Sequence, residues 1–119
     1  MYKKLLIDDY KDIEADKVIR NFFDAIRFLL LEEKNEKFDE LLLDYYLDNG
    51  HTGLEILQEC IWTEQYTEAN GEDKKYLLPN KITLVSSDKS CNKRMGDFLI
   101  QNGYKKDIGW SFIRELNKN

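Results

Sequence analysis

Short apolar runs that end in acidic or hydroxyl residues alternate with segments of helical periodicity along the chain. The runs at residues 3–7, 40–43 and 81–85 have the length and the leucine-rich or β-branched character of buried strands. Apolar positions at helical spacing, preceded by capping residues, predict one helix that starts at residue 52 or 53 and another that ends at residue 102. Strands that alternate with helices are typical of parallel βαβ units, so the pattern predicts an α/β fold.

The region between the first two strands allows two interpretations. Its apolar residues recur at helical spacing, which fits a single helix from residue 14 to residue 33. Alternatively, residues 17–20 form a short strand, Asn21 caps the next element, and a helix runs over residues 22–33. The pattern alone leaves both interpretations open.

The chain between residues 62 and 80 is polar and holds the only proline. We expect a helix end there, followed by a long loop. A short last strand is predicted near Tyr104. The apolar spacing after it predicts a short C-terminal helix that packs on the body through Trp110, Phe112, Ile113 and Leu116.

Composition and charge narrow the class of protein. With 119 residues, 42% of them hydrophobic, we expect residues 1–119 to form a single domain with its own core. The formal net charge of −5 argues against general nucleic-acid binding, because phosphate backbones attract an excess of Lys and Arg. No apolar run is long enough for a signal peptide or a membrane span, so we expect a cytoplasmic protein without membrane contact. Cys60 and Cys91 lack a CxxC spacing and are expected to be buried structural thiols.

Polar side chains follow all three predicted strands. Asp8 and Asp9 come after the first, Asp44 after the second, and Ser86 after the third. The carboxyl ends of parallel strands meet at one edge of a sheet, so we expect these residues to gather there. Three carboxylates suit Mg²⁺, and a carboxylate beside Mg²⁺ can attack a phosphoryl group whose oxygens the Ser86 hydroxyl could bind. The alternative is that the acids are solvated loop residues and Ser86 is a helix cap.

The same residues carry a resemblance to a known family. It lies in Leu6-Ile7-Asp8-Asp9, Leu43-Asp44-Tyr45-Tyr46-Leu47, Thr52-Gly53-Leu54-Glu55-Ile56-Leu57 and Leu84-Val85-Ser86-Ser87. Over about residues 3 to 104 the chain resembles a response-regulator receiver domain, and it is most similar to the compact cyclic-phosphate processing receivers. That compact family has one helix fewer before the acceptor acid, which favours the strand at residues 17–20. The resemblance implies a flavodoxin-like, doubly wound parallel sheet of four to five strands flanked by helices, with one helix shortened or missing.

The resemblance also implies a lysine in the site. Receivers usually place a lysine, often followed by proline, at the end of the fifth strand, where it contacts the phosphoryl group. Here the corresponding stretch reads Lys105-Lys106-Asp107 without a proline, and the sequence alone assigns no lysine to this role.

These observations support three hypotheses for function. The first is a stand-alone regulatory receiver that binds Mg²⁺ at Asp8, Asp9 and Asp44, takes a phosphoryl group from a phosphodonor onto Asp44, and acts through a protein partner or as a homodimer. The second is a degenerate receiver fold that binds a phosphate-bearing ligand, such as a nucleotide or RNA end, or a partner protein, through the segment at residues 62–80. The third is a phosphoesterase that depends on Mg²⁺, although no general acid or base stands out.

Overall fold

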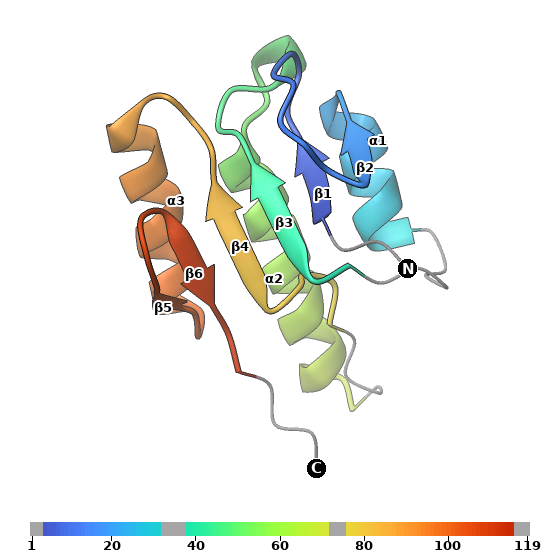
Figure 1. The fold of residues 1–119 in the computed structure, drawn as a ribbon. Coiled ribbons are helices and arrows are strands. Elements are labelled where there is room, and N and C mark those ends of the chain that lie inside the picture. The colour runs from blue at the N-terminus through green and yellow to red at the C-terminus, as the bar shows by residue number, and fades with distance from the viewer. Residues whose placement is uncertain (1–3, 32–37, 72–75, 116–119) are drawn as a thin grey trace.

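The strands form one mostly parallel sheet (Figure 1). The computed structural model describes residues 4–31, 38–71 and 76–115. Within them the strand order is β2-β1-β3-β4-β6-β5, where the first four strands are parallel and both β4–β6 and β6–β5 are antiparallel pairs. The strands are β1 (Lys4–Ile7), β2 (Lys17–Ile19), β3 (Glu40–Leu43), β4 (Lys81–Leu84), β5 (Lys105–Lys106) and β6 (Ser111–Ile113). This sheet with its flanking helices confirms the predicted α/β, receiver-like fold, and within the described residues it has six strands where the sequence predicted four to five.

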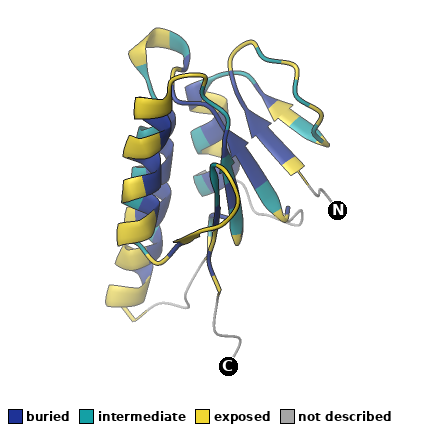
Figure 2. Ribbon diagram, turned by 60° about the vertical axis from the view of Figure 1, so that its left-hand side comes forward, coloured by how far each residue is buried: buried dark blue, intermediate teal, exposed yellow. Residues whose placement is uncertain are grey.

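The α-helices of the described residues lie together on one side of the sheet (Figure 2). Helix α2 packs against both α1 and α3, so it occupies the middle of the row. The helices are α1 (Phe22–Ile26), α2 (Gly53–Ala69) and α3 (Lys89–Gln101); a π-helical turn, η1 (Arg27–Leu31), continues α1, and a 3₁₀ turn, η2 (Asp48–Gly50), precedes α2. In the part of the chain that the structure describes, no helix has both the length and the apolar character needed to cross a membrane.

The core lies between the sheet and the helices. Alternate residues of a strand point to opposite faces, and Leu5 and Ile7 of β1 join the hydrophobic cluster on the helix side. Leu6 and its register neighbour Leu42 are also buried but belong to the opposite face. The loop between β1 and β2 crosses in front of β1 on that face (Figure 1). The second face is therefore covered in part by a loop, and this loop carries residues of the site described below.

The structure decides between the two interpretations of residues 14–33. Residues 17–19 are strand β2, and Asn21 caps α1 by accepting the backbone N–H of Asp24 at 2.9 Å. The backbone N–H of Phe22 donates to the Asp48 carboxylate at 2.7 Å, so the loop before α2 also fixes the start of α1. The interpretation with a strand and a capped helix is thus confirmed, and the single long helix is wrong.

The last described elements, β5 and β6, form a β-hairpin, so the helix predicted over Trp110, Phe112 and Ile113 is wrong. Strand β5 follows Tyr104 directly, and the buried ring of Phe112 lies on β6. A Cβ atom at Gly96 of α3 would lie 2.6 Å from Phe112 Cζ, so the glycine allows this ring to pack on the helix. A few apolar residues cannot distinguish a helix from a strand, and pairing with β4 decided the outcome. Leu116 lies outside the described residues.

Helix α2 ends at Ala69, within the segment at residues 62–80 where the sequence predicted a helix end followed by a loop. Buried polar residues hid the position of this end, because Glu64 lies on the inner side of the helix. Its carboxylate accepts the Arg114 guanidinium at 2.8 Å and the backbone N–H groups of Leu77 and Leu78. The helical part of the segment at residues 62–80 therefore runs to Ala69, and the predicted loop is confined to the residues after it, of which 72–75 lie outside the described part.

Candidate metal centre

Three acids meet at the carboxyl edge of the sheet. Asp8 and Asp9 directly follow β1, and Asp44 directly follows the neighbouring strand β3. One carboxylate oxygen from each of the three lies within 4.8 Å of the others. Asp8 and Asp44 are buried, at 0% and 5% exposure, whereas Asp9 is exposed. The structure thus brings together the three residues that the sequence placed at one edge.

Asp8 has one satisfied and one unsatisfied carboxylate oxygen. Its Oδ1 accepts the backbone N–H groups of Tyr10 at 3.1 Å and Lys11 at 3.0 Å, which closes a tight turn after β1. Its Oδ2 is buried and has no hydrogen-bond partner. An unpaired buried carboxylate oxygen is costly, and a cation held by the cluster would remove that cost.

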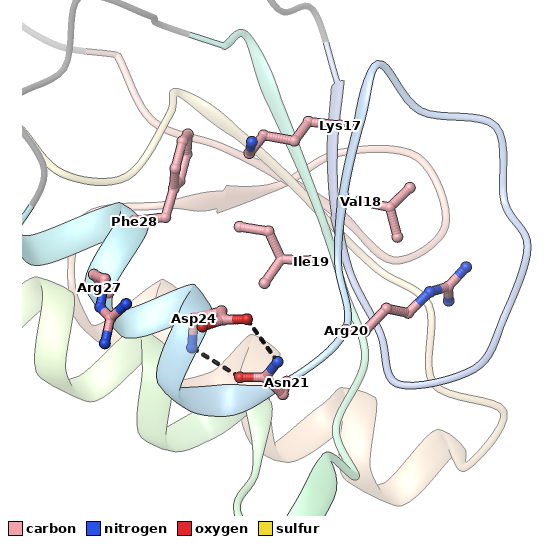
Figure 3. A pocket seen from close by; sticks show the side chains of 8 residues that line it. All are labelled: Lys17, Val18, Ile19, Arg20, Asn21, Asp24, Arg27 and Phe28. Carbon is pink, nitrogen blue, oxygen red and sulfur yellow. Dashed lines mark hydrogen bonds between the residues drawn. The ribbon is translucent and has the colours of Figure 1, made fainter.

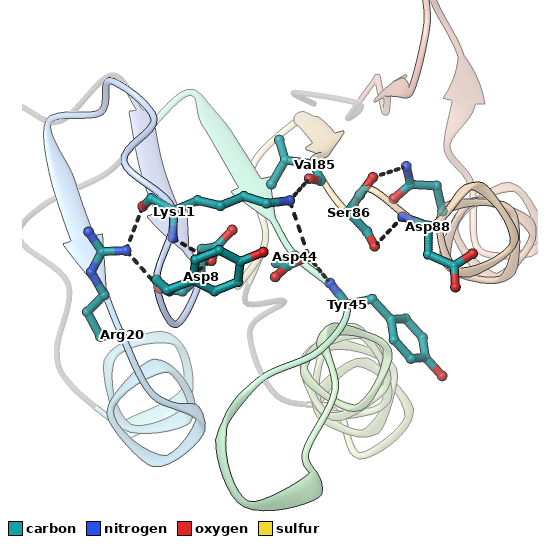
Figure 4. Close-up of polar contacts among 10 residues, drawn as sticks. Asp8, Lys11, Arg20, Asp44, Tyr45, Val85, Ser86 and Asp88 are labelled. Carbon is teal, nitrogen blue, oxygen red and sulfur yellow. Dashed lines mark hydrogen bonds and ion pairs between the residues drawn. The ribbon is translucent and has the colours of Figure 1, made fainter.

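Asp44 is fixed by the backbone on both sides. Its N–H donates to the Ile7 carbonyl at 3.1 Å, and its Oδ1 accepts the Tyr45 N–H at 2.8 Å (Figure 4). Burial raises the pKa of Asp44, and the negative charges of Asp8 and Asp9 raise it further. The Tyr45 hydrogen bond and Lys11 act in the opposite direction without cancelling the rise in pKa. A cation at the cluster would favour the ionised form and so oppose the rise in the pKa of Asp44.

Lys11 brings a positive charge into the site from the loop between β1 and β2. Its Nζ donates to the Val85 carbonyl at 2.6 Å and lies 4.0 Å from Asp44 Oδ1 (Figure 4). Arg20, at the end of β2, holds this loop: its guanidinium donates to the Lys11 carbonyl at 2.6 Å and to the Asp8 carbonyl at 3.3 Å. The Lys11 side chain therefore reaches across the site from the loop after β1 to the end of β4.

Comparison with known families assigns the chain. The sequence model of the cyclic-phosphate processing receiver domain matches residues 3–101. The chain belongs to this family. Searches of curated proteins and of solved structures gave no match.

Ser86 lies at the predicted place in this receiver domain, at the end of β4. Its Oγ accepts the Asp88 N–H at 3.2 Å, and its carbonyl accepts the Asn92 side-chain amide at 2.8 Å. Both contacts tie Ser86 to the start of α3, but the residue that caps this helix is Asp88, whose side chain accepts the N–H groups of Ser90 and Cys91. The alternative interpretation of Ser86 as the helix cap is therefore wrong. Because a hydroxyl can accept one hydrogen bond and donate another, the Ser86 O–H remains able to donate.

Sequence reasoning missed Lys11 and considered Lys105 and Lys106 instead. These two lysines are exposed on β5, the outermost strand, and Lys106 Nζ lies over the Trp110 ring at 4.8 Å. One signal could have identified Lys11: it comes three residues after Asp8, where the loop leaves the carboxyl edge. The lysine that the structure places beside Asp44 thus comes from the first loop.

The residues of the cluster fit Mg²⁺. Mg²⁺ prefers one or two carboxylates, several waters and phosphate oxygens. Here two buried carboxylates face an exposed third, and the unpartnered Asp8 Oδ2 supplies a ligand that nothing else among the described residues uses. The buried, unsatisfied oxygen distinguishes this cluster from ordinary surface acids.

Proposed function

We propose that this receiver domain binds Mg²⁺ at Asp8, Asp9 and Asp44, accepts a phosphoryl group on Asp44, and transmits that change to a protein partner. The observation that carries the proposal is the buried Asp8 Oδ2 without a partner, within 4.8 Å of the other two carboxylates.

The two oxygens of Asp44 have different surroundings. Oδ1 accepts the Tyr45 N–H and faces Lys11, whereas no donor from the described residues contacts Oδ2. Oδ2 is therefore the oxygen that attacks phosphorus. The new O–P bond forms as the bond between phosphorus and the donor breaks, and the donor leaves with that electron pair. The product is an acyl phosphate on Asp44.

Two positive groups support this step. When bound, Mg²⁺ supplies charge that screens the repulsion between the carboxylate and the incoming phosphoryl oxygens. Lys11 Nζ, 4.0 Å from Asp44 Oδ1, is placed to neutralise a phosphoryl oxygen on the side of β4, and the Ser86 O–H donates to another. The carbonyl of Val85 holds the ammonium in position beforehand.

The test is to incubate the protein with Mg²⁺ and acetyl phosphate and to measure its intact mass. We expect a mass gain of one phosphoryl group in the wild type and in Asp39→Asn, an exposed acid outside the cluster. Asp44→Asn should show no gain. Unmodified wild-type protein, under conditions that load another receiver, would refute the acceptor role of Asp44.

A second candidate is noncovalent binding of a phosphate-bearing ligand. The family name refers to cyclic-phosphate processing, and the Tyr46 ring, two residues after Asp44, is 59% exposed and could stack on a nucleobase. Under this candidate a nucleoside cyclic phosphate binds in the presence of Mg²⁺, and Tyr46→Ala weakens its binding. Binding without any mass gain from acetyl phosphate would favour this candidate over the first.

A further inference from the structure

A pocket of about 400 Å³ lies between strand β2 and helix α1, and its lining shares no residue with the acid cluster. Lys17, Ile19 and Phe28 border it on the helix side, and Val18 and Arg20 turn toward the other side of the strand (Figure 3). Ile19 and Phe28 are buried and form an apolar floor. The pocket is thus a groove that follows the outer edge of β2.

The edge of β2 offers unused backbone groups. β2 is the first strand in the sheet order, so among the described residues no strand pairs with its outer side. The Ile19 carbonyl accepts the Asp8 N–H at 3.2 Å, toward β1. In a parallel ladder alternate residues bond to the same neighbour, so Val18 turns its N–H and carbonyl outward. An added strand would find a donor and an acceptor there.

The groove is positively charged although the chain as a whole carries −5. Lys17 and Arg27 contribute two positive charges to its lining, against the single acid Asp24. Arg20 turns to the other side of β2 and is paired with Asp12 at 2.9 Å. The Asp24 carboxylate accepts the Asn21 side-chain amide at 2.8 Å, which directs it to the cap of α1. Lys17 Nζ lies 5.1 Å from the centre of the Phe28 ring, so a cation stands directly above the apolar floor.

We propose that the outer edge of β2 binds an extended acidic segment of a partner protein by strand addition. The open edge supplies main-chain hydrogen bonds, the groove takes alternate side chains, and the cations select acidic residues. A second copy of this chain is a poor occupant, because pairing two β2 edges would bring Lys17 and Arg27 of both copies together. A small anion would leave the strand edge unused.

The experiment uses the full chain and a fluorescein-labelled peptide, Glu-Val-Glu-Val-Glu-Val, with binding followed by fluorescence anisotropy. We expect saturable binding that weakens about tenfold in the double variant Lys17→Glu/Arg27→Glu, because two attractions become repulsions. The matched control, Lys89→Glu/Lys105→Glu, changes net charge equally on other elements and should bind as the wild type does. The acid cluster is untouched, so this test is independent of phosphorylation.

Two further probes separate strand addition from charge attraction. Val18→Pro removes only the outward N–H, which an edge strand tolerates, and should weaken binding about tenfold with an unchanged melting temperature. A peptide N-methylated at alternate residues should not bind. Equal binding of the methylated peptide, or equal binding by the Lys17/Arg27 variant, would overturn the proposal. Displacement of the peptide by inorganic phosphate or AMP would also overturn it, because it would indicate an anion site. A dimer of this chain that excludes the peptide would overturn it as well.

Discussion

Asp8→Asn removes one charge from the acid cluster and keeps the shape of the side chain. The amide oxygen can still accept the N–H groups of Tyr10 and Lys11. Carboxylate oxygens of Asp8 and Asp44 lie within 4.8 Å, where two unit charges repel by about 3.5 kcal/mol at an effective dielectric constant of about 20. Lys11, 4.0 Å from Asp44, offsets part of this repulsion. We therefore expect metal-free Asp8→Asn to gain about 1–3 kcal/mol in unfolding free energy.

Urea unfolding followed by tryptophan fluorescence, with and without Mg²⁺, measures this effect. At a Mg²⁺ concentration 100 times its dissociation constant, the wild type should gain about 2.7 kcal/mol and Asp8→Asn almost nothing. Asp39→Asn, which removes an exposed acid, should respond to Mg²⁺ as the wild type does. If Asp8→Asn is less stable than the wild type without Mg²⁺ and is still stabilised by the ion, the cluster is not a cation site.

Three further predictions follow from the same contacts. A Cβ at Gly53 would overlap the Asp44 carbonyl, so Gly53→Ala should displace Asp44 and weaken Mg²⁺ binding in calorimetry at least about tenfold; unchanged affinity would contradict this. Because the pKa of Asp44 is raised in the native state, that state binds more protons than the unfolded state between about pH 4 and the raised pKa. The free energy of unfolding of the metal-free protein should therefore fall as pH rises through this range, and Asp44→Asn should weaken this pH dependence in urea titrations. Arg114→Met leaves the buried Glu64 carboxylate without its guanidinium partner and should lower the free energy of unfolding in urea by about 3–5 kcal/mol. Adding Glu64→Gln to this variant should recover part of the loss. A double variant whose loss equals the sum of the two single losses would contradict the pairing.

The sequence predicted the parts of the molecule that depend on local pattern. Strands β1 and β3 lie inside a parallel sheet, and each is an apolar run after its first residue, whereas β4 alternates between buried and half-buried residues. The acids that follow β1 and β3 share the carboxyl edge because these two strands are parallel. Their convergence could be derived without coordinates. The burial of Asp8, with one oxygen left unpaired, could not, because it depends on how the next loop folds over the sheet.

Features that depend on long-range pairing escaped the sequence. Glu64 reads as a surface residue until Arg114, fifty residues later in the chain, is placed beside it. The apolar residues after Tyr104 read equally well as helix or strand until their partner β4 is known. Val18 and Ile19 fit a helical stripe as well as a strand, and pairing with β1 decided between them. In each case a tertiary contact overrode a weak local signal.

Strand β6, the neighbour of β4 in the sheet, does not carry its C-terminal end to the acids. A parallel strand beside β4 would end at the carboxyl edge and could deliver a side chain there. The actual neighbour, β6, runs antiparallel: its last residue, Ile113, pairs with Lys81, the first residue of β4. Its C-terminal end therefore lies at the opposite edge from Asp44, and Lys106 of β5 lies over the Trp110 ring. The positive group beside Asp44 comes instead from the loop after β1, where Lys11 is held by Val85 at the end of β4 and by Arg20 at the end of β2.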